Sequence, residues 1–276
     1  MKSSNKLLVI LTSAIALSTY VGASIIYANS SFSIGDEKTI QGNGQIVTQV
    51  RSVSPFSGIH VSGLANVMIV KGNSDQVNIS TDQNLLPYLK TTVKNKQLYI
   101  GNEKNTDLNP SHVINIIITS KTLHFSDISA AGKITLTAKN IDTPKLRAKI
   151  GGDTNMTLSG KIENGDLNLA GKSDVTLCDM SATDIHFNVS GNSRIHLCGH
   201  ASNVILKSAG KVDVDAKNFT ADNLEVLGAG DITMTSRVQK SIHVTAFGKV
   251  TVHYYGNPSV IDKKSFGNVT LKKIGD

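Results

Sequence analysis

Residues 207–234 read KSAGKVDVDAKNFTADNLEVLGAGDITM, and this stretch decides the fold class. An Ala-Gly turn at Gly210 leads into four residues of alternating character, 211–214, and a second turn at Gly230 leads into the equivalent residues 231–234. Between them, Leu224 and Val226 mark another alternating segment. Such alternation predicts strands that bury one face, and the glycines indicate tight turns between them.

The same unit recurs through the second half of the chain. Alternating strands are expected at 133–136, 155–158, 174–177, 194–197, 211–214, 231–234, 249–252 and 268–271, about 19 residues apart. A glycine turn precedes each strand, and a second apolar pair, such as Leu167 and Leu169, lies between successive strands. The period is too short for a propeller blade and is not helical. We therefore predict an all-β, single-domain parallel β-solenoid with rungs of about 19 residues.

If each rung stacks on the next, equivalent residues form columns. Inward columns then hold Ile, Val, Leu and Met, which supplies a core although the chain has no Trp. The polar residue that opens each strand is expected to stack in one outward column: Lys133, Asn155, Asp174, Arg194, Lys211, Asp231, Lys249 and Asn268. Residues 34–129 alternate less regularly, and we expect them to form an irregular N-terminal cap and the first rungs.

The N-terminus has the features of a secretory signal peptide. Two lysines precede an apolar run from Leu7 to Val21, and small residues follow that run. Residues 1–28 are therefore assigned to a signal peptide cleaved after Ala28, or alternatively after Ala23. Residues 29–44 then form the mature N-terminal segment and 45–276 the solenoid domain. An uncleaved membrane anchor is the other interpretation. The protein is expected to be extracytoplasmic, in the periplasm, in the outer envelope or secreted.

Length and charge restrict the class of function. The 276 residues suit one large or two modest domains, and a charged fraction of 18% with apolar residues throughout argues against disorder. The formal net charge is +7, but only 5% of the residues are aromatic. Nucleic-acid binding needs clustered Lys and Arg with stacking aromatic rings, so nucleic acid is not expected as a partner.

Several segments resemble one known family. They are residues 53–61 (VSPFSGIHV), 67–72, 77–79, 82–86 and 98–100, with the later elements 208–210 (SAG), 228–231 (GAGD) and 255–258 (YGNP). Over roughly residues 45–275 the chain resembles the bacterial head GIN domain family, whose members are labelled putative auto-transporter adhesins. The resemblance implies a right-handed β-helix-like solenoid in the bacterial envelope and supplies no catalytic residues.

The two cysteines, Cys178 and Cys198, occupy the same position in consecutive rungs. Rungs stack about 4.8 Å apart, which lies inside the Cα separation that a disulfide accepts. Outside the cytoplasm the pair forms either an inter-rung disulfide or two stacked free thiols. His186, His196 and His200 are close in sequence, but no CxxC or helical HxxxH spacing supports a metal site, and none is assigned.

One polar patch is the best candidate for enzymatic chemistry. It comprises Arg194, His196, Lys211, Asp213, Asp215 and Asp231. Two carboxylates at a suitable distance can hydrolyse a glycoside. Polar residues are nonetheless required on every rung to keep the outside hydrated, and rungs of about 17 to 22 residues leave no long loops to build a site. We therefore expect no catalytic residues, no cofactor and no enzyme activity.

The sequence favours a non-catalytic, adhesin-like module for glycan binding or surface display, because regularly spaced polar faces suit repeating polymers. The expected partners are a cell-surface polysaccharide or an envelope protein, with membrane contact only through an uncleaved signal anchor. Self-association through the end strands is a further expectation. The alternatives are a polysaccharide lyase or hydrolase that uses Asp213, Asp215 and Asp231, and a purely structural envelope protein.

Overall fold

The computed structural model describes residues 38–276, which form strands joined by turns and loops. The strands are β1 Lys38–Gln41, β2 Ile46–Ser52, β3 Gly58–Lys71, β4 Gln76–Asp82, β5 Leu89–Lys94, β6 Gln97–Asn102, β7 Thr106–Asn109, β8 Ile114–Ser120, β9 Asp127–Ser208, β10 Lys211–Gly228, β11 Asp231–Ala246, β12 Lys249–Tyr255, β13 Val260–Ser265 and β14 Asn268–Gly275. Within this range no helix has the length and hydropathy to span a bilayer. The expected signal peptide and both cleavage sites lie outside the described residues.

The protein is all-β, and its main sheet is mixed. Its strand order is β14-β12-β11-β10-β9-β3-β8-β4-β2, while β1 and β7 form a separate two-stranded sheet. The pairs from β3 through β9 to β14 are parallel. The pairs β2–β4, β4–β8 and β5–β6 are antiparallel. The sheet is therefore not parallel throughout, and its antiparallel pairs all lie in the N-terminal part, where an irregular cap was expected.

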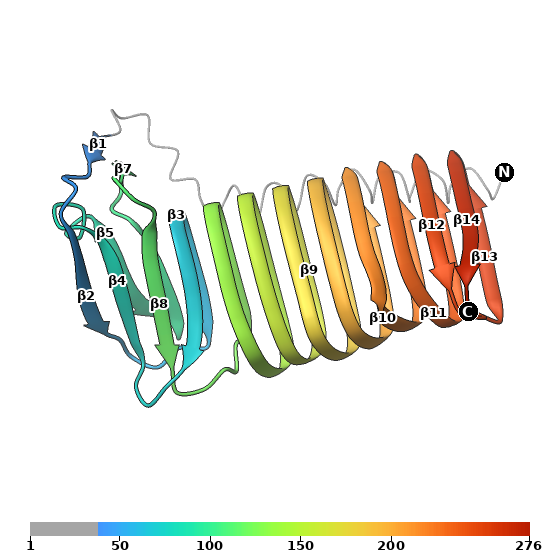
Figure 1. Ribbon diagram of the computed structural model, residues 1–276, viewed down its shortest axis with the longest axis horizontal. Coiled ribbons are helices and arrows are strands. Elements are labelled where there is room, and N and C mark those ends of the chain that lie inside the picture. The colour runs from blue at the N-terminus through green and yellow to red at the C-terminus, as the bar shows by residue number, and fades with distance from the viewer. Residues whose placement is uncertain (1–37) are drawn as a thin grey trace.

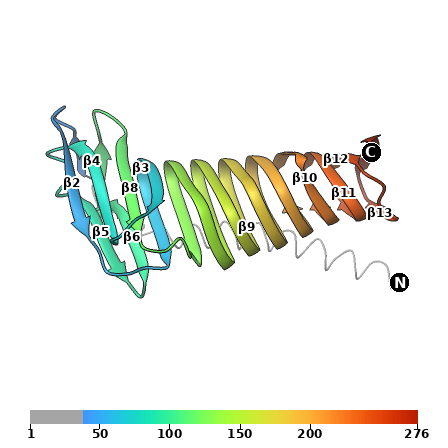
Figure 2. The same cartoon turned by 60° about the horizontal axis from the view of Figure 1, so that its bottom comes forward.

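Most of the chain winds as a coil. Figure 1 shows β9 passing through successive turns, which β10, β11 and β12 continue toward β13 and β14. The strands β2, β4 and β8 stand at the opposite end, and the turned view in Figure 2 shows the same arrangement. Neighbouring turns are paired in register, as Lys211 with Asp231, Asp231 with Lys249, and Lys249 with Asn268.

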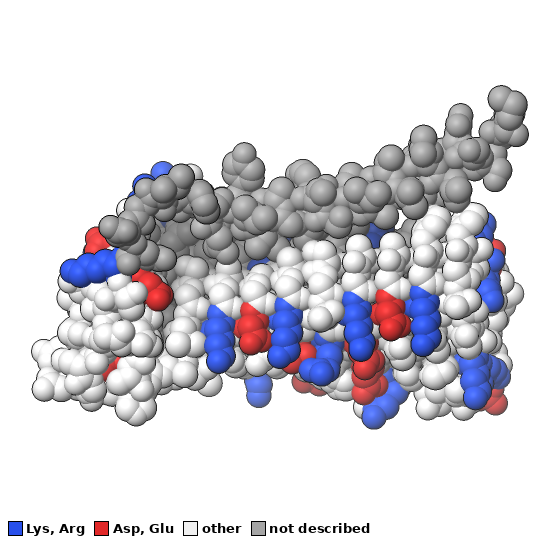
Figure 3. All heavy atoms as spheres, turned by 90° about the horizontal axis from the view of Figure 1, so that it is seen from above, with Lys and Arg blue, Asp and Glu red and all other residues white. Residues whose placement is uncertain are grey.

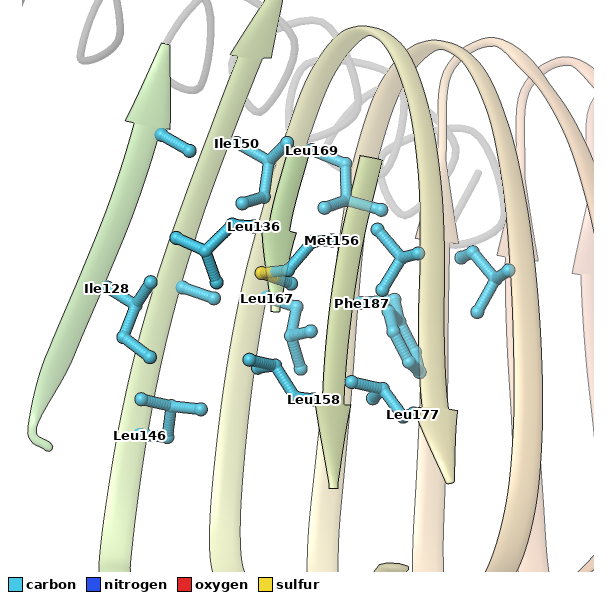
Figure 4. Close-up of a cluster of buried hydrophobic side chains, with 14 of the residues drawn as sticks. Ile128, Leu136, Leu146, Ile150, Met156, Leu158, Leu167, Leu169, Leu177 and Phe187 are labelled. Atoms are coloured by element: carbon cyan, nitrogen blue, oxygen red, sulfur yellow. The ribbon is translucent and has the colours of Figure 1, made fainter. Parts of the chain in front are cut away.

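Alternating apolar residues fill the interior of the coil. Leu146, Leu167, Leu169 and Leu177 are each no more than 2% exposed. Figure 4 shows these side chains, with those of neighbouring turns, pointing into the space that the coil encloses. Burial of apolar surface stabilises the fold by roughly 25 cal/mol per Å². Columns of aliphatic side chains thus form the core, as the alternation predicted.

A column of glycines sets how the turns stack. It runs through Gly63, Gly132, Gly152, Gly171, Gly191, Gly210, Gly230, Gly248 and Gly267. At every member after the first, a Cβ would overlap the backbone carbonyl oxygen of the preceding glycine. Several members also have a positive φ, for example +85° at Gly152 and +120° at Gly191. Packing and backbone conformation therefore both require glycine here.

The glycine column corrects the predicted alignment of three strands. The first inward position lies two residues after each glycine. After Gly152, Gly171 and Gly191 it holds the buried residues Thr154, Ser173 and Ser193. The apolar residues that were expected there come two residues later. Strand side chains alternate with a period of two, so a two-residue slip buries the same set of residues. Alternation alone could not reveal the error.

The correction changes which polar residues are neighbours. Arg194 pairs with Asp213, not with Lys211, and Ile195 pairs with Val214. The predicted outward column is therefore wrong at Asn155, Asp174 and Arg194, which lie in a different row from Lys211.

The buried carboxylate of Asp82 connects the N-terminal strands. Its Oδ1 accepts hydrogen bonds from Gly44 N at 2.6 Å and Ser111 Oγ at 2.7 Å, and its Oδ2 accepts one from Ser111 N at 2.9 Å. Burial by itself raises the pKa of this carboxyl. The hydrogen bonds from Ser111 and Gly44 outweigh burial, so the pKa of Asp82 is lowered from its ordinary value.

Candidate functional site

The six residues of the predicted polar patch fall into two groups. Arg194 and His196 lie on β9 and are register partners of Asp213 and Asp215 on β10. These four residues line an open hollow of ≈ 260 Å³. The sequence therefore identified four residues that the fold brings together.

Lys211 and Asp231 belong to a separate row beside the glycine column. They pair with each other, and Asp231 also pairs with Lys249. From Gly132 onward, the residues that follow the column glycines are Lys133, Asp153, Lys172, Asn192, Lys211, Asp231, Lys249 and Asn268. Figure 3 shows charged side chains of alternating sign along this side of the coil. Opposite charges on adjacent strands favour this register and keep the face hydrated.

Most charged groups of the hollow have an oppositely charged partner and are exposed to solvent. Arg194 Nη1 lies 3.5 Å from Asp174 Oδ1, and His196 Nδ1 lies 3.5 Å from Asp215 Oδ2. The side chains of Arg194 and Asp215 are 74% and 46% exposed. A general acid for glycoside cleavage relies on burial to hold its proton. The hollow does not provide that burial.

Cys178 and Cys198 lie on neighbouring turns of β9, with their Cα atoms 4.5 Å apart, and the structure joins them in a disulfide. Of the three histidines near them in sequence, His196 contacts the pair, with Nε2 3.7 Å from Cys198 Sγ. His200 instead lies 3.6 Å from Asp222, and His186 is exposed. Stacking thus brings together a cysteine pair and a histidine that sequence spacing did not connect.

The structure contains a second candidate site, which the sequence reasoning missed. A cavity of ≈ 430 Å³ lies where β3, β5, β6 and β9 meet. Its polar and aromatic lining consists of His60, Ser62, Lys90, Thr92, Tyr99, Asn102, Ser129 and Lys149. Aromatic surface with a few convergent polar groups is typical of small-molecule and sugar sites.

An aromatic pair forms one wall of this cavity. His60 and Tyr99 are register partners on β3 and β6, and their rings stack with centroids 4.7 Å apart and planes 8° from parallel. His60 also pairs with Ser129 of β9, so a row of three side chains crosses the wall. Tyr99 is 43% exposed, which leaves ring surface available to a ligand.

The cavity combines a histidine ring with two lysines, one of which is paired with a carboxylate. Burial lowers the pKa of His60, and Lys149 acts in the same direction. A hydrogen bond with Gln97 and the charge of Asp127 act in the opposite direction but do not reverse the shift. The lowered pKa keeps His60 mainly neutral at pH 7. Lys149 supplies positive charge to the lining, whereas the charge of Lys90 is offset by Glu103, whose Oε1 lies 3.2 Å from Lys90 Nζ.

The sequence held only a partial signal for this site. Tyr99 and His60 occupy outward positions of the alternating segments 98–100 and 59–61. Their contact depends on the parallel pairing of β6 with β3. Alternation identifies the outward face of a strand but not its partner strand.

Residues 55–258 match the family described as "Putative auto-transporter adhesin, head GIN domain". Comparison with curated proteins gives no match.

Several solved structures have the same fold. One, described as a putative lipid binding protein from Parabacteroides distasonis ATCC 8503, has a TM-score of 0.70 and 20% identity, covering 86% of this chain and 100% of the other. A putative adhesin from the same organism has a TM-score of 0.72 and 19% identity, with coverage of 86% and 100%. A putative adhesin from Parabacteroides merdae ATCC 43184 has a TM-score of 0.70 and 17% identity, with coverage of 86% and 99%. Identities this low establish the shared fold alone.

Proposed function

Since the chain belongs to the head GIN domain family, we propose that it is a non-catalytic, adhesin-like module of the bacterial cell envelope that binds a glycan in the cavity around Tyr99. The observation that carries this proposal is the stacked pair of Tyr99 and His60 in a polar-lined cavity, where Tyr99 is 43% exposed.

A sugar ring matches the chemistry of this cavity. Its faces carry C–H groups that can pack against the exposed surface of Tyr99. Its hydroxyls can exchange hydrogen bonds with Ser62, Thr92 and Asn102, which line the same cavity. Lys149, which has no carboxylate partner among the described residues, favours a sugar that bears a carboxylate or phosphate group, because opposite charges attract the ligand into the site.

The architecture proposed for this role is a parallel β-solenoid spanning 45–276, with rungs of about 19 residues and an atypical N-terminal cap. Its parallel pairs from β9 to β14 and its stacked glycines support this description. A signal peptide over residues 1–28 would deliver the domain outside the cytoplasm, where a surface polysaccharide is available.

The ion pairing and solvent exposure of the acidic patch at Asp213 and Asp215 support a binding role without catalysis. Asp215 is engaged by His196 at 3.5 Å and by Lys217 at 3.8 Å, and the surrounding hollow is open to solvent. Neither carboxylate of the Asp213 and Asp215 pair is buried. Cleavage of a polysaccharide at this patch is therefore not expected.

The test measures binding and cleavage of acidic and neutral envelope polysaccharides by the secreted chain. Tyr99→Ala is expected to weaken retention of an acidic polysaccharide about tenfold, the equivalent of losing roughly 1.4 kcal/mol of stacking and contact. The bound polysaccharide is expected to keep its chain length.

Phe266→Ala is the matched control. Phe266 is an exposed ring, 60% accessible, that stacks on Phe247 with centroids 5.0 Å apart but does not line the cavity. Its removal should leave retention unchanged. Equal losses in the two variants, or no retention by the wild type, would reject the cavity as a glycan site. Shortened chains that depend on Asp213 and Asp215 would replace the binding proposal with an enzymatic one.

A further inference from the structure

Three metal-ligating side chains converge on one outward face of β9. A ligand atom from each of Cys178, His196 and Cys198 lies within 4.8 Å of the other two. Behind the histidine, Asp215 Oδ2 lies 3.5 Å from His196 Nδ1. None of these four residues lines the cavity around Tyr99, so this cluster is separate from the proposed glycan site.

The coil produces the cluster. Cys178 and Cys198 lie at the same distance along the chain from the stacked glycines Gly171 and Gly191, so they are neighbours across two turns. His196 precedes Cys198 by two residues, which places both side chains on the same face of the strand. All three side chains are half-buried, so an ion and a reductant can reach them from solvent.

We propose that reduction of the Cys178–Cys198 disulfide creates a site for one thiophilic cation of the Zn²⁺ type, held by the two cysteine sulfurs and His196 Nε2. A dithiol reductant supplies the two electrons: it becomes a cyclic disulfide, the S–S bond breaks, and two protons end on Cys178 and Cys198. The cation then displaces those two protons and binds both thiolates.

The distances suit this coordination. Zn²⁺ binds thiolate sulfur at about 2.3 Å and imidazole nitrogen at about 2.0 to 2.1 Å, so tetrahedral ligand atoms lie roughly 3.5 to 3.8 Å apart. Cys198 Sγ and His196 Nε2 are already 3.7 Å apart. Opening the disulfide lets the two sulfurs separate to the same range, and three protein ligands leave one position for water or an exogenous ligand.

Asp215 completes the arrangement as a positioning residue. A metal-bound imidazole usually gives its other N–H to a carboxylate, which fixes the tautomer and orients the ring. With Asp215 near Nδ1, the lone pair of Nε2 is directed toward the cysteines. Asp215 thus favours the tautomer of His196 that carries its proton on Nδ1 and leaves Nε2 free for an ion.

The experiment titrates Co²⁺, and then Zn²⁺, into the full chain in its oxidised form and after reduction by a dithiol that is removed under anaerobic conditions. Reduced protein should bind one Co²⁺ with sulfur-to-cobalt charge-transfer absorption, Zn²⁺ should displace it, and oxidised protein should show no such band. His196→Ala and Asp215→Asn should each weaken the affinity about 10- to 100-fold.

His200→Ala is the matched control, because His200 is also close to Cys198 in sequence and pairs with a carboxylate, Asp222, at 3.6 Å. The reduced His200→Ala variant should bind Co²⁺ with the same affinity as the wild type. The proposal is wrong if reduced protein binds no Co²⁺, if oxidised protein binds it equally, or if loss of His196 leaves the affinity unchanged. Asp215→Asn retains all three ligands, so it still tests the contribution of His196 if His196→Ala misfolds, and an unchanged affinity would reject the positioning role of Asp215.

Discussion

Gly191 is needed in the coil for two reasons: its backbone conformation and the lack of space for a side chain. Its φ of +120° lies where side-chain-bearing residues are strained, and a Cβ would overlap the carbonyl oxygen of Gly171. We predict that Gly191→Ala lowers the free energy of unfolding by about 3 kcal/mol, from strain and overpacking together. Urea denaturation followed by circular dichroism measures the loss.

Gly44 separates these two causes. Its φ is +79°, but a Cβ there would meet no atom within 4 Å. Gly44→Ala should therefore cost only about 1 kcal/mol, the effect of backbone conformation without the steric overlap. If the two substitutions cost the same, close stacking of the glycines contributes nothing to stability.

Asp82 makes stability depend on pH. Its folded-state pKa is lowered below the ordinary value of 3.8, so its contribution is complete above that value and is lost as the pH falls through the folded-state pKa. We predict acid destabilisation below about pH 4. Asp82→Asn should cost about 1 to 3 kcal/mol at pH 7 and should lose less stability on acidification. Thermal melts of both proteins at pH 7 and pH 3 test this, and parallel losses would contradict it.

At the scale of the strand, the sequence predicts orientation better than register. Period-two alternation correctly assigned Leu167 and Leu169 to the interior, because burial acts on each side chain locally. It misaligned the strands near Thr154, Ser173 and Ser193, because a two-residue slip preserves both faces. Pairing depends on glycines that contact each other one turn apart, which is a tertiary contact.

Because strand pairing cannot be inferred from alternation alone, the sequence predicted some contacts of the candidate sites and missed others. Cys178 and Cys198 were expected to be neighbours because both lie in regular turns that share one period. The pairing of His60 with Tyr99 joins strands of the N-terminal part, where the repeat is irregular and parallel and antiparallel pairs are mixed. Without a period, no spacing rule could connect these two rings.

The disulfide gives a prediction at the scale of adjacent turns. Its closed loop has a sequence separation of 20, for which chain entropy alone gives about 3 kcal/mol. We predict that denatured, unreduced protein has no reactive thiol, and that reduction or Cys198→Ser lowers the unfolding free energy by about 3 kcal/mol. A thiol count with urea denaturation tests both statements. Two reactive thiols before reduction would reject the link.

Over the whole molecule, the two ends of the sheet are expected to be less stable than its middle. Each turn of the coil contacts mainly its neighbours, so stability is a sum of local interfaces, and a terminal turn has one interface fewer. The sheet ends at β2 and at β14. Near the C-terminal end, Val260 and Ile261 are each 47% exposed, whereas Leu224 and Val226 of β10 are fully buried.

This difference predicts a gradient of local opening. In native-state hydrogen exchange, amides of β13 and β14 should exchange faster than those of β9 and β10, because opening the last turn exposes less apolar surface than opening the middle. A single exchange free energy along the chain would contradict the local-interface description, since it would mean that the coil opens only as one unit.

The same hydrogen-exchange experiment, repeated at several protein and salt concentrations, tests self-association through the end strands. Lys272 and Lys273 lie on β14. Lys273 is paired with Asp276, so the charge that opposes pairing of two such edges is that of Lys272. We therefore predict that protection of β14 rises with protein concentration mainly at high ionic strength, where this repulsion is screened, while protection of β9 stays constant. A monomeric mass with unchanged β14 exchange at high salt would show that the edge does not pair. Increased protection of both strands would instead place the contact along the side of the coil.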